Sequence, residues 1–101
     1  MSDIDALEVA AARAALESTN LSPRYWAVGE QLDDHCCLLR QEGRWVAGYF
    51  ERGSFRVKFV ETESRAAVTQ FVMWVSSVQE STERSAQATA EWLTKHGKTR
   101  P

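Results

Sequence analysis

Two runs of strand-forming residues, joined at a single glycine, constrain the fold of this chain more than any other feature. The runs are Arg44 to Arg52 and Ser54 to Glu61, with Gly53 between them. A link this short joins only antiparallel neighbours, because parallel strands need a longer crossover. The sequence therefore predicts a β-hairpin that turns at the corner Glu51-Arg52-Gly53.

The second run of this hairpin alternates regularly between apolar and charged residues. Phe55, Val57 and Phe59 occupy one set of positions, and Arg56 and Lys58 occupy the other. Successive strand residues point to opposite faces, so the first set predicts a buried face and the second a face in water. We expect helices to cover the face that carries Phe55, Val57 and Phe59. The first run has large apolar side chains at both sets of positions, which predicts a central strand.

Two further strands are expected before the hairpin, at Tyr25 to Gln31 and at Cys36 to Gln41. The links are short here as well, at Leu32 to His35 and at Glu42-Gly43. The second link is typical of a two-residue turn in which glycine supplies a positive φ. Short links favour antiparallel neighbours, so the four strands are predicted to form a meander.

Three helices are predicted from apolar residues at helical spacing. The first covers Ser2 to Thr19, and the second opens at Thr62-Glu63. The second has the strongest pattern, a broad apolar stripe from Ala67 to Val78. Helical order weakens in Gln79 to Thr82, and a third helix is predicted from Glu83 to His96.

The predicted order is α-β-β-β-β-α-α, an α+β fold formed by a single domain over residues 1–101. A four-stranded antiparallel meander has its helices packed on one face and leaves the other face largely open. Residues 98–101 are expected to form a frayed tail. A chain of 101 residues can bury one core and is too short for two.

Charge and hydropathy narrow the possible partners and the location. The net charge is −2, with both signs spread along the chain, which argues against nucleic acid or an anionic membrane as partner. No apolar run is long enough to span a bilayer. The acidic start, Met1-Ser2-Asp3, is unlike a signal peptide. We therefore expect a cytoplasmic protein.

The sequence contains no pattern typical of a catalytic or metal site. Cys36 and Cys37 are adjacent, so in a strand they point to opposite faces and neither chelate a metal together nor bridge easily. Two unpaired thiols fit a reducing cytoplasm. His35 and His96 have no ligand spacing, and neither a GxSxG elbow nor a glycine-rich phosphate loop occurs. We expect no enzyme activity, no metal and no cofactor; whether a thiol is reactive stays open.

Two groups of charged residues are the candidate partner-binding residues. Glu30, Asp33 and Asp34 form an acidic run before a strand. This run is either a solvated turn or a negative patch for a basic partner. Arg56 and Lys58, on the face expected to be open, would instead suit an acidic partner.

The four tryptophans have two readings. Trp74 lies on the stripe of the main helix and is expected in the core. Trp26 and Trp45 lie on strands whose two faces both carry apolar groups, so either they are core residues or one is exposed as an interface residue. Trp92 is placed beside the apolar side of the last predicted helix.

The pattern Trp45-x3-Tyr49-x-Glu51-Arg52-Gly53, followed by Phe59 and Thr62-Glu63, resembles the small immunity proteins of bacterial polymorphic-toxin systems. The resemblance covers Ser22 to Val78. It implies a non-catalytic cytoplasmic domain that binds and neutralises a cognate toxin. Such residues would hold the fold rather than contact the toxin. Glu51 could pair with a cation across the hairpin, and Arg52 could bond backbone carbonyls at the corner.

Three functions remain in competition at this point. The first is an immunity protein that binds a cognate toxin. The second is a homodimeric structural or interaction module that pairs through its sheet. The third is a small-molecule-binding or enzymatic domain that uses the concave sheet.

Overall fold

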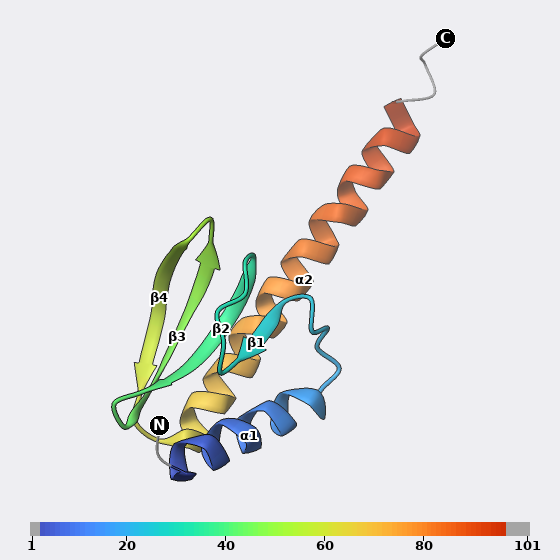
Figure 1. Cartoon of the computed structure of the whole chain (residues 1–101). Coiled ribbons are helices and arrows are strands. Elements are labelled where there is room, and N and C mark those ends of the chain that lie inside the picture. The colour runs from blue at the N-terminus through green and yellow to red at the C-terminus, as the bar shows by residue number, and fades with distance from the viewer. Residues whose placement is uncertain (1–2, 97–101) are drawn as a thin grey trace.

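The structure is a computed structural model that describes residues 3–96, with side chains described for residues 3–92. Two helices and a four-stranded sheet form an α+β fold (Figure 1). In chain order these are α1 (Asp3–Glu17), β1 (Trp26–Val28), β2 (His35–Gln41), β3 (Arg44–Glu51), β4 (Ser54–Glu61) and α2 (Ser64–His96). The expected helix start at Ser2 and the expected tail at 98–101 lie outside the described residues.

The first strand is shorter than expected and runs parallel to its neighbour, so the prediction of a purely antiparallel meander is wrong. β1 has only 3 residues and pairs in register from Trp26↔Cys36 to Val28↔Leu38. The chain turns at Gly29, where φ is 85°, and returns through residues 29–34 to start β2 in the same direction. A strand this short is about 10 Å long. A link of this length can reach up to ~20 Å, so it can return along so short a strand.

The other two connections are tight hairpins, as the sequence predicts. Glu42 and Gly43 have φ of 50° and 77°, and Arg52 and Gly53 have φ of 52° and 77°. Positive φ at both central residues defines a type I′ turn, whose twist matches that of the strands it joins. The sheet order is therefore β1-β2-β3-β4, with β2, β3 and β4 antiparallel.

A β-bulge in the last hairpin changes which residues of β4 face the helices. Ala47 pairs with Phe59, and the next residue, Gly48, pairs with Val57, so Lys58 is the extra residue. Phe59 packs with the helices, whereas Phe55 packs on the opposite face. The prediction that Phe55, Val57 and Phe59 share the helix-covered face is therefore wrong, because the bulge interrupts their alternation.

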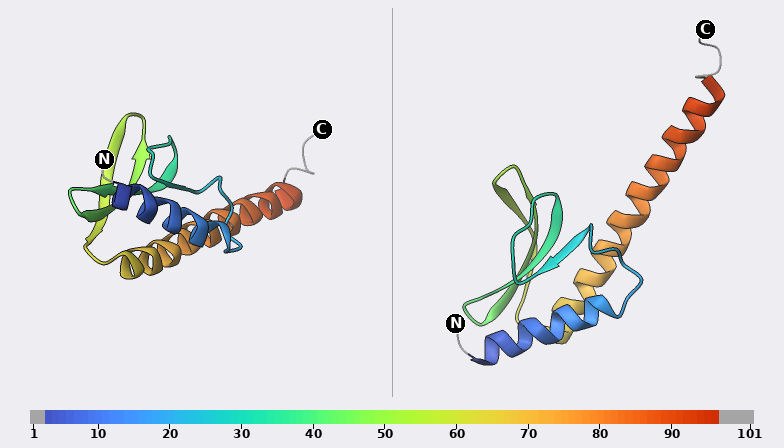
Figure 2. Two further views of the ribbon diagram at one scale, coloured as in Figure 1. Left: turned by 60° about the horizontal axis from the view of Figure 1, so that its bottom comes forward. Right: turned by 45° about the vertical axis from the view of Figure 1, so that its right-hand side comes forward.

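Both helices lie on one side of the sheet, and α2 is continuous (Figure 2). The predicted break at Gln79 to Thr82 and the separate third helix are wrong, because that segment has neither glycine nor proline to end a helix. At 33 residues α2 is about 50 Å long. Its second half projects beyond the sheet (Figure 1). Every side chain from residue 80 to 92 is exposed.

The main core lies between the sheet and the two helices. It combines residues of α1, of the strands and of α2, and includes Leu16, Val28, Leu38, Trp45, Ala67, Phe71 and Val75. The predicted stripe on α2 is confirmed, since its central members are fully buried. Trp26 and Trp45 are both buried in this core, which decides between the two readings of these tryptophans.

Phe71→Ala is expected to lower the free energy of unfolding by about 3–5 kcal/mol, as large core truncations do. Phe71 is 0% exposed and packs edge-on against Trp74. Met73→Ala is the matched control, because Met73 is on the same helix but 68% exposed. Urea unfolding of both variants is the measurement. Equal losses in the two would contradict the assignment of this face of α2 to the core.

Candidate functional site

The acidic residues of the link between β1 and β2 lie beside the β3–β4 turn. The Arg52 backbone N–H donates to Asp33 Oδ1 at 2.8 Å, and the Asp34 N–H donates to the Phe50 carbonyl at 2.7 Å. Asp34 takes a φ of 60°, which Asp tolerates better than most residues. These bonds fix the end of the link against the turn, so that Asp33, Asp34 and Glu51 all lie near Tyr49. Glu30 lies earlier in the same link, near Cys37. We call these four acidic residues the acidic corner.

Burial and the charges of the acidic corner raise the pKa values of the neighbouring side chains of Tyr49 and Cys37. Burial raises the pKa of Tyr49, and the charges of Asp34, Glu51 and Asp33 raise it further. Burial likewise raises the pKa of Cys37, and Glu30 adds to that shift. The acids of the corner therefore act on the side chains beside them, and carboxylates placed in this way attract a basic partner.

Apolar side chains lie next to the acidic corner on the face of the sheet that the helices leave open. Phe50 and Phe55 pack there over Ala27, Cys37 and Leu39. Val57 and Val60 extend this surface along β4 and are 58% and 50% exposed. We call Phe50, Phe55, Val57 and Val60 the open apolar face. Exposed apolar residues rimmed by charge are typical of a protein-binding surface.

The structure separates the two groups of charged residues that the sequence singles out. Asp33 and Asp34 lie beside the β3–β4 turn, and Glu30 lies earlier in the same link, near Cys37. Arg56 pairs with Tyr49, so it lies on the helix side of the sheet and not on the open face as expected. Lys58 is the extra residue of the bulge. The open face therefore lacks Arg56 and presents the apolar side chains of Phe50, Phe55, Val57 and Val60.

The motif residues at the other end of β3 make structural contacts. The Trp45 indole N–H donates to Ser64 Oγ at 3.0 Å, and the Arg40 guanidinium lies 5.2 Å from the Trp45 ring centroid. Arg40 also pairs with Asp5 at 3.1 Å and with Glu8 at 2.8 Å, both on α1. The sequence analysis missed Arg40, although a single cation within the apolar strand β2 was a usable signal.

The remaining motif residues form the turn itself. Arg52 contributes its backbone N–H and its positive φ, rather than a side-chain bond to backbone carbonyls. Among the ion pairs of residues 3–92, none includes Glu51, so the expected pairing across the hairpin is not formed. Gly53 has open space around its Cα, so its role is the positive φ alone.

Both thiols are buried and neither is placed for chemistry. Burial raises the pKa of the Cys36 thiol to about 12. Low-pKa thiols occur in electropositive, accessible settings, which are the opposite of this one. Within the described part of the chain, no three His, Cys, Asp or Glu residues are grouped so as to hold a metal ion. The described helices include none that is both long and apolar enough to cross a membrane.

Comparisons with family models, with curated proteins and with solved structures found no match to this chain. The resemblance carried by Trp45 to Gly53 therefore remains a prediction.

Arg40→Met is expected to lower the free energy of unfolding by roughly 1–3 kcal/mol, because it removes the cation that pairs with the carboxylates of Asp5 and Glu8. The Glu8→Gln variant supplies the double-mutant cycle. Removing both charges should cost less than the sum of the two single changes. Strict additivity in urea unfolding would show that the ion pair contributes nothing.

The thiols are expected to resist alkylation by iodoacetamide at pH 8 in the folded protein and to react fully in denaturant. The same burial predicts a pH dependence. Unfolding frees Cys36 to ionise near its ordinary pKa of 9.0, whereas the folded state holds its proton up to about 12. Stability from this group is therefore complete below pH 9 and is lost as the pH rises toward 12. A Cys36→Ala variant should lose part of this alkaline dependence in thermal unfolding.

Proposed function

We propose that this chain is a non-catalytic immunity protein that binds and neutralises a cognate bacterial toxin. The observation that carries the proposal is the open apolar face with the acidic corner beside it. A small domain that leaves large apolar side chains in water next to a concentrated charge is suited to binding another protein. The proposal places the protein in the bacterial cytoplasm, where a toxin would have to be blocked.

The two parts of this surface would contribute differently to binding. Val57 and Val60, with the rings of Phe50 and Phe55, supply apolar area that is removed from water on contact. The acidic corner supplies long-range attraction, which mainly accelerates encounter with a basic partner. A toxin that acts on nucleic acid would present such a basic surface.

The resemblance of the Trp45-to-Gly53 pattern supports the same function. The resemblance implies that the residues of the pattern hold the fold, and the contacts of these residues fit that role. Trp45 is fully buried, and Arg52 and Gly53 form the turn that receives Asp33. In this proposal the pattern positions the acidic corner, and the toxin contacts the side chains around it.

Co-expression with the product of the neighbouring gene tests the proposal. We expect that product to be toxic alone, and growth to be restored when this chain is co-expressed and bound. Failure to bind the product or to restore growth would rule out the immunity function. A neighbouring gene product that is harmless would also rule out the immunity function.

Glu30→Lys combined with Glu51→Lys is expected to slow association with the toxin, and the loss should shrink as salt is added. Asp33 is left in place because its carboxylate accepts the Arg52 N–H. Glu17→Lys with Glu80→Lys is the matched control, since it makes the same charge change on exposed residues of the helices.

Val57→Asp should weaken binding by roughly tenfold or more without unfolding the domain. Association rates by surface plasmon resonance distinguish these effects.

A homodimer is the second candidate, and the free edge of β4 favours it. β4 pairs with β3 on one side only, and it carries the exposed Val57 and Val60. An unpaired strand with exposed apolar residues can pair with a second copy. A mass that doubles with concentration in the absence of any partner would support this function, and Val57→Asp should then abolish the doubling.

A further inference from the structure

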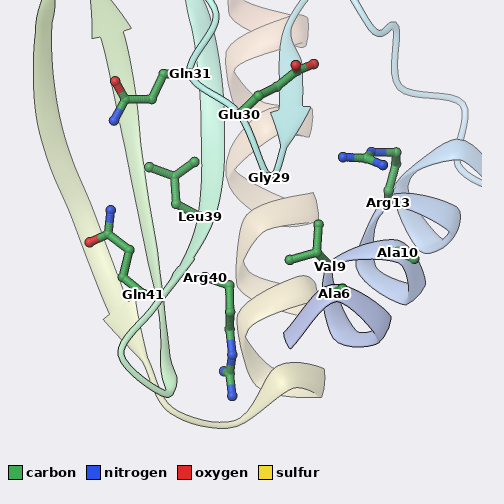
Figure 3. Close-up of a pocket in the computed structure, with 10 residues that line it drawn as sticks. All are labelled: Ala6, Val9, Ala10, Arg13, Gly29, Glu30, Gln31, Leu39, Arg40 and Gln41. Atoms are coloured by element: carbon green, nitrogen blue, oxygen red, sulfur yellow. The ribbon is translucent and has the colours of Figure 1, made fainter. Parts of the chain in front are cut away.

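A groove lies between β2 and α1 at a position where the sheet lacks a strand. β1 pairs only with Cys36–Leu38, so the last part of β2, Leu39–Gln41, has β3 on one side and no strand on the other. A cavity of about 500 Å³ fills this position (Figure 3). Its helix wall consists of Ala6, Val9, Ala10 and Arg13, and we call it the β2 groove.

The backbone of β2 offers unpaired hydrogen-bonding groups to this groove. The Cys36 N–H donates to the Tyr25 carbonyl, and the Leu38 carbonyl accepts the Gly29 N–H, both at 2.8 Å. The side to which the backbone N–H and C=O groups point alternates along a strand with a period of two residues. The N–H and C=O of Arg40 therefore point to the same side as those of Cys36 and Leu38, which is the side of the groove. Neither group has a partner within residues 3–96. Such an edge can bind an extended segment as an added strand.

One end of the groove is closed by the chain itself. After β1 the backbone turns at Gly29, and Glu30 and Gln31 line that end (Figure 3). An extended segment that lies beside Leu39–Gln41 therefore cannot continue past Gly29. The natural occupant is a chain terminus, with about 10 Å of extended backbone beside β2.

The charge at the closed end determines which terminus fits. Arg13 Nη2 donates to the Val28 carbonyl at 2.7 Å, and a Cβ on Gly29 would lie 3.1 Å from the same nitrogen. Arg13 is exposed and forms no ion pair with a carboxylate of residues 3–92. Glu30 also lines this end, and its carboxylate extends away from Leu39 and Arg40 (Figure 3). A guanidinium that has no carboxylate partner attracts a carboxylate and repels an amine.

We propose that the β2 groove binds the C-terminal segment of another protein as an added strand. The segment runs antiparallel to β2, bonds the N–H and C=O of Arg40, and places its terminal carboxylate at Arg13. Its apolar side chains pack against Val9 and the alanines of α1. This site is separate from the open apolar face, so it does not depend on the toxin-neutralising function.

The test uses the full chain and two synthetic probes. The first is a mixture of random heptapeptides with free C-terminal carboxylates, and the second is the same mixture with C-terminal amides. Immobilised protein should retain peptides from the first mixture, enriched in apolar residues near the C-terminus, and should release the second. For an enriched peptide, amidation should weaken binding by about tenfold or more, because a charge-assisted hydrogen bond is lost.

Three variants separate the proposed contacts from a general effect on the fold. Arg13→Gln should weaken binding of the enriched peptide by about tenfold, and Arg13→Lys should restore part of it. Ala10→Phe should abolish binding, because it fills the groove from an exposed position of α1. Arg24→Gln is the matched control, an exposed arginine outside the groove, and should bind as the parent does.

Fluorescence anisotropy gives the affinities, and circular dichroism confirms that each variant is folded; if Ala10→Phe is not, Ala6→Phe at the same wall replaces it. Retention of neither mixture would overturn the proposal, as would equal retention of both. Unchanged affinity in the folded groove-filling variant would also overturn it. None of these measurements involves a toxin, so their failure is distinct from failure of the immunity function.

Discussion

The side chain of Trp45 connects the sheet to both helices, and the positions of the helices depend on it. The indole is fully buried, donates its N–H to Ser64 at the start of α2, and lies beside the Arg40 guanidinium that pairs with α1. Burying a tryptophan removes up to about 250 Å² from water, which is worth roughly 6 kcal/mol at most. One hydrogen bond contributes about 1 kcal/mol. Burial of the ring therefore supplies most of the stability, while the polar contacts determine where α1 and α2 begin against the sheet.

The shortness of β1 has two consequences that together shape the surface. Because the chain leaves the sheet at Gly29, the end of β2 remains unpaired and the β2 groove is formed. Because the chain must then return, the link of residues 29–34 reaches the β3–β4 turn and holds its acids there. Only glycine suits the turning point, since its φ is 85° and a Cβ would lie 2.7 Å from a methyl of Val9. One backbone position thus determines both the acidic corner and the groove.

Features that depend on local sequence were predictable, and those that depend on pairing were not. The positions of both hairpin turns and the buried stripe of α2 followed from residue types and spacing. The bulge at Lys58 did not, because the alternation of β4 is unbroken in sequence. A usable signal was Gly48 in mid-strand: a Cβ there would lie 2.5 Å from the Arg56 carbonyl oxygen and 2.6 Å from the Phe55 ring. The acidic residues were identified because they lie within five residues of one another in the sequence, whereas Arg13 gains its importance only from the crossing of α1 past Gly29.

The two proposed binding surfaces are nearly independent, which follows from the sheet order. β1 and β2 border the groove, and β4 lies at the opposite edge. The open apolar face exposes only part of four side chains, a few hundred Å² at most, whereas a stable interface takes about 800 Å² from each partner. A toxin held there must therefore contact the acidic corner as well, so that apolar and charged contacts belong to one interface. Glu30 is the one residue shared by the corner and the lining of the groove. Any coupling between a bound toxin and a bound C-terminus would pass through that carboxylate: a basic partner that neutralises Glu30 would strengthen the attraction of Arg13 for a carboxylate.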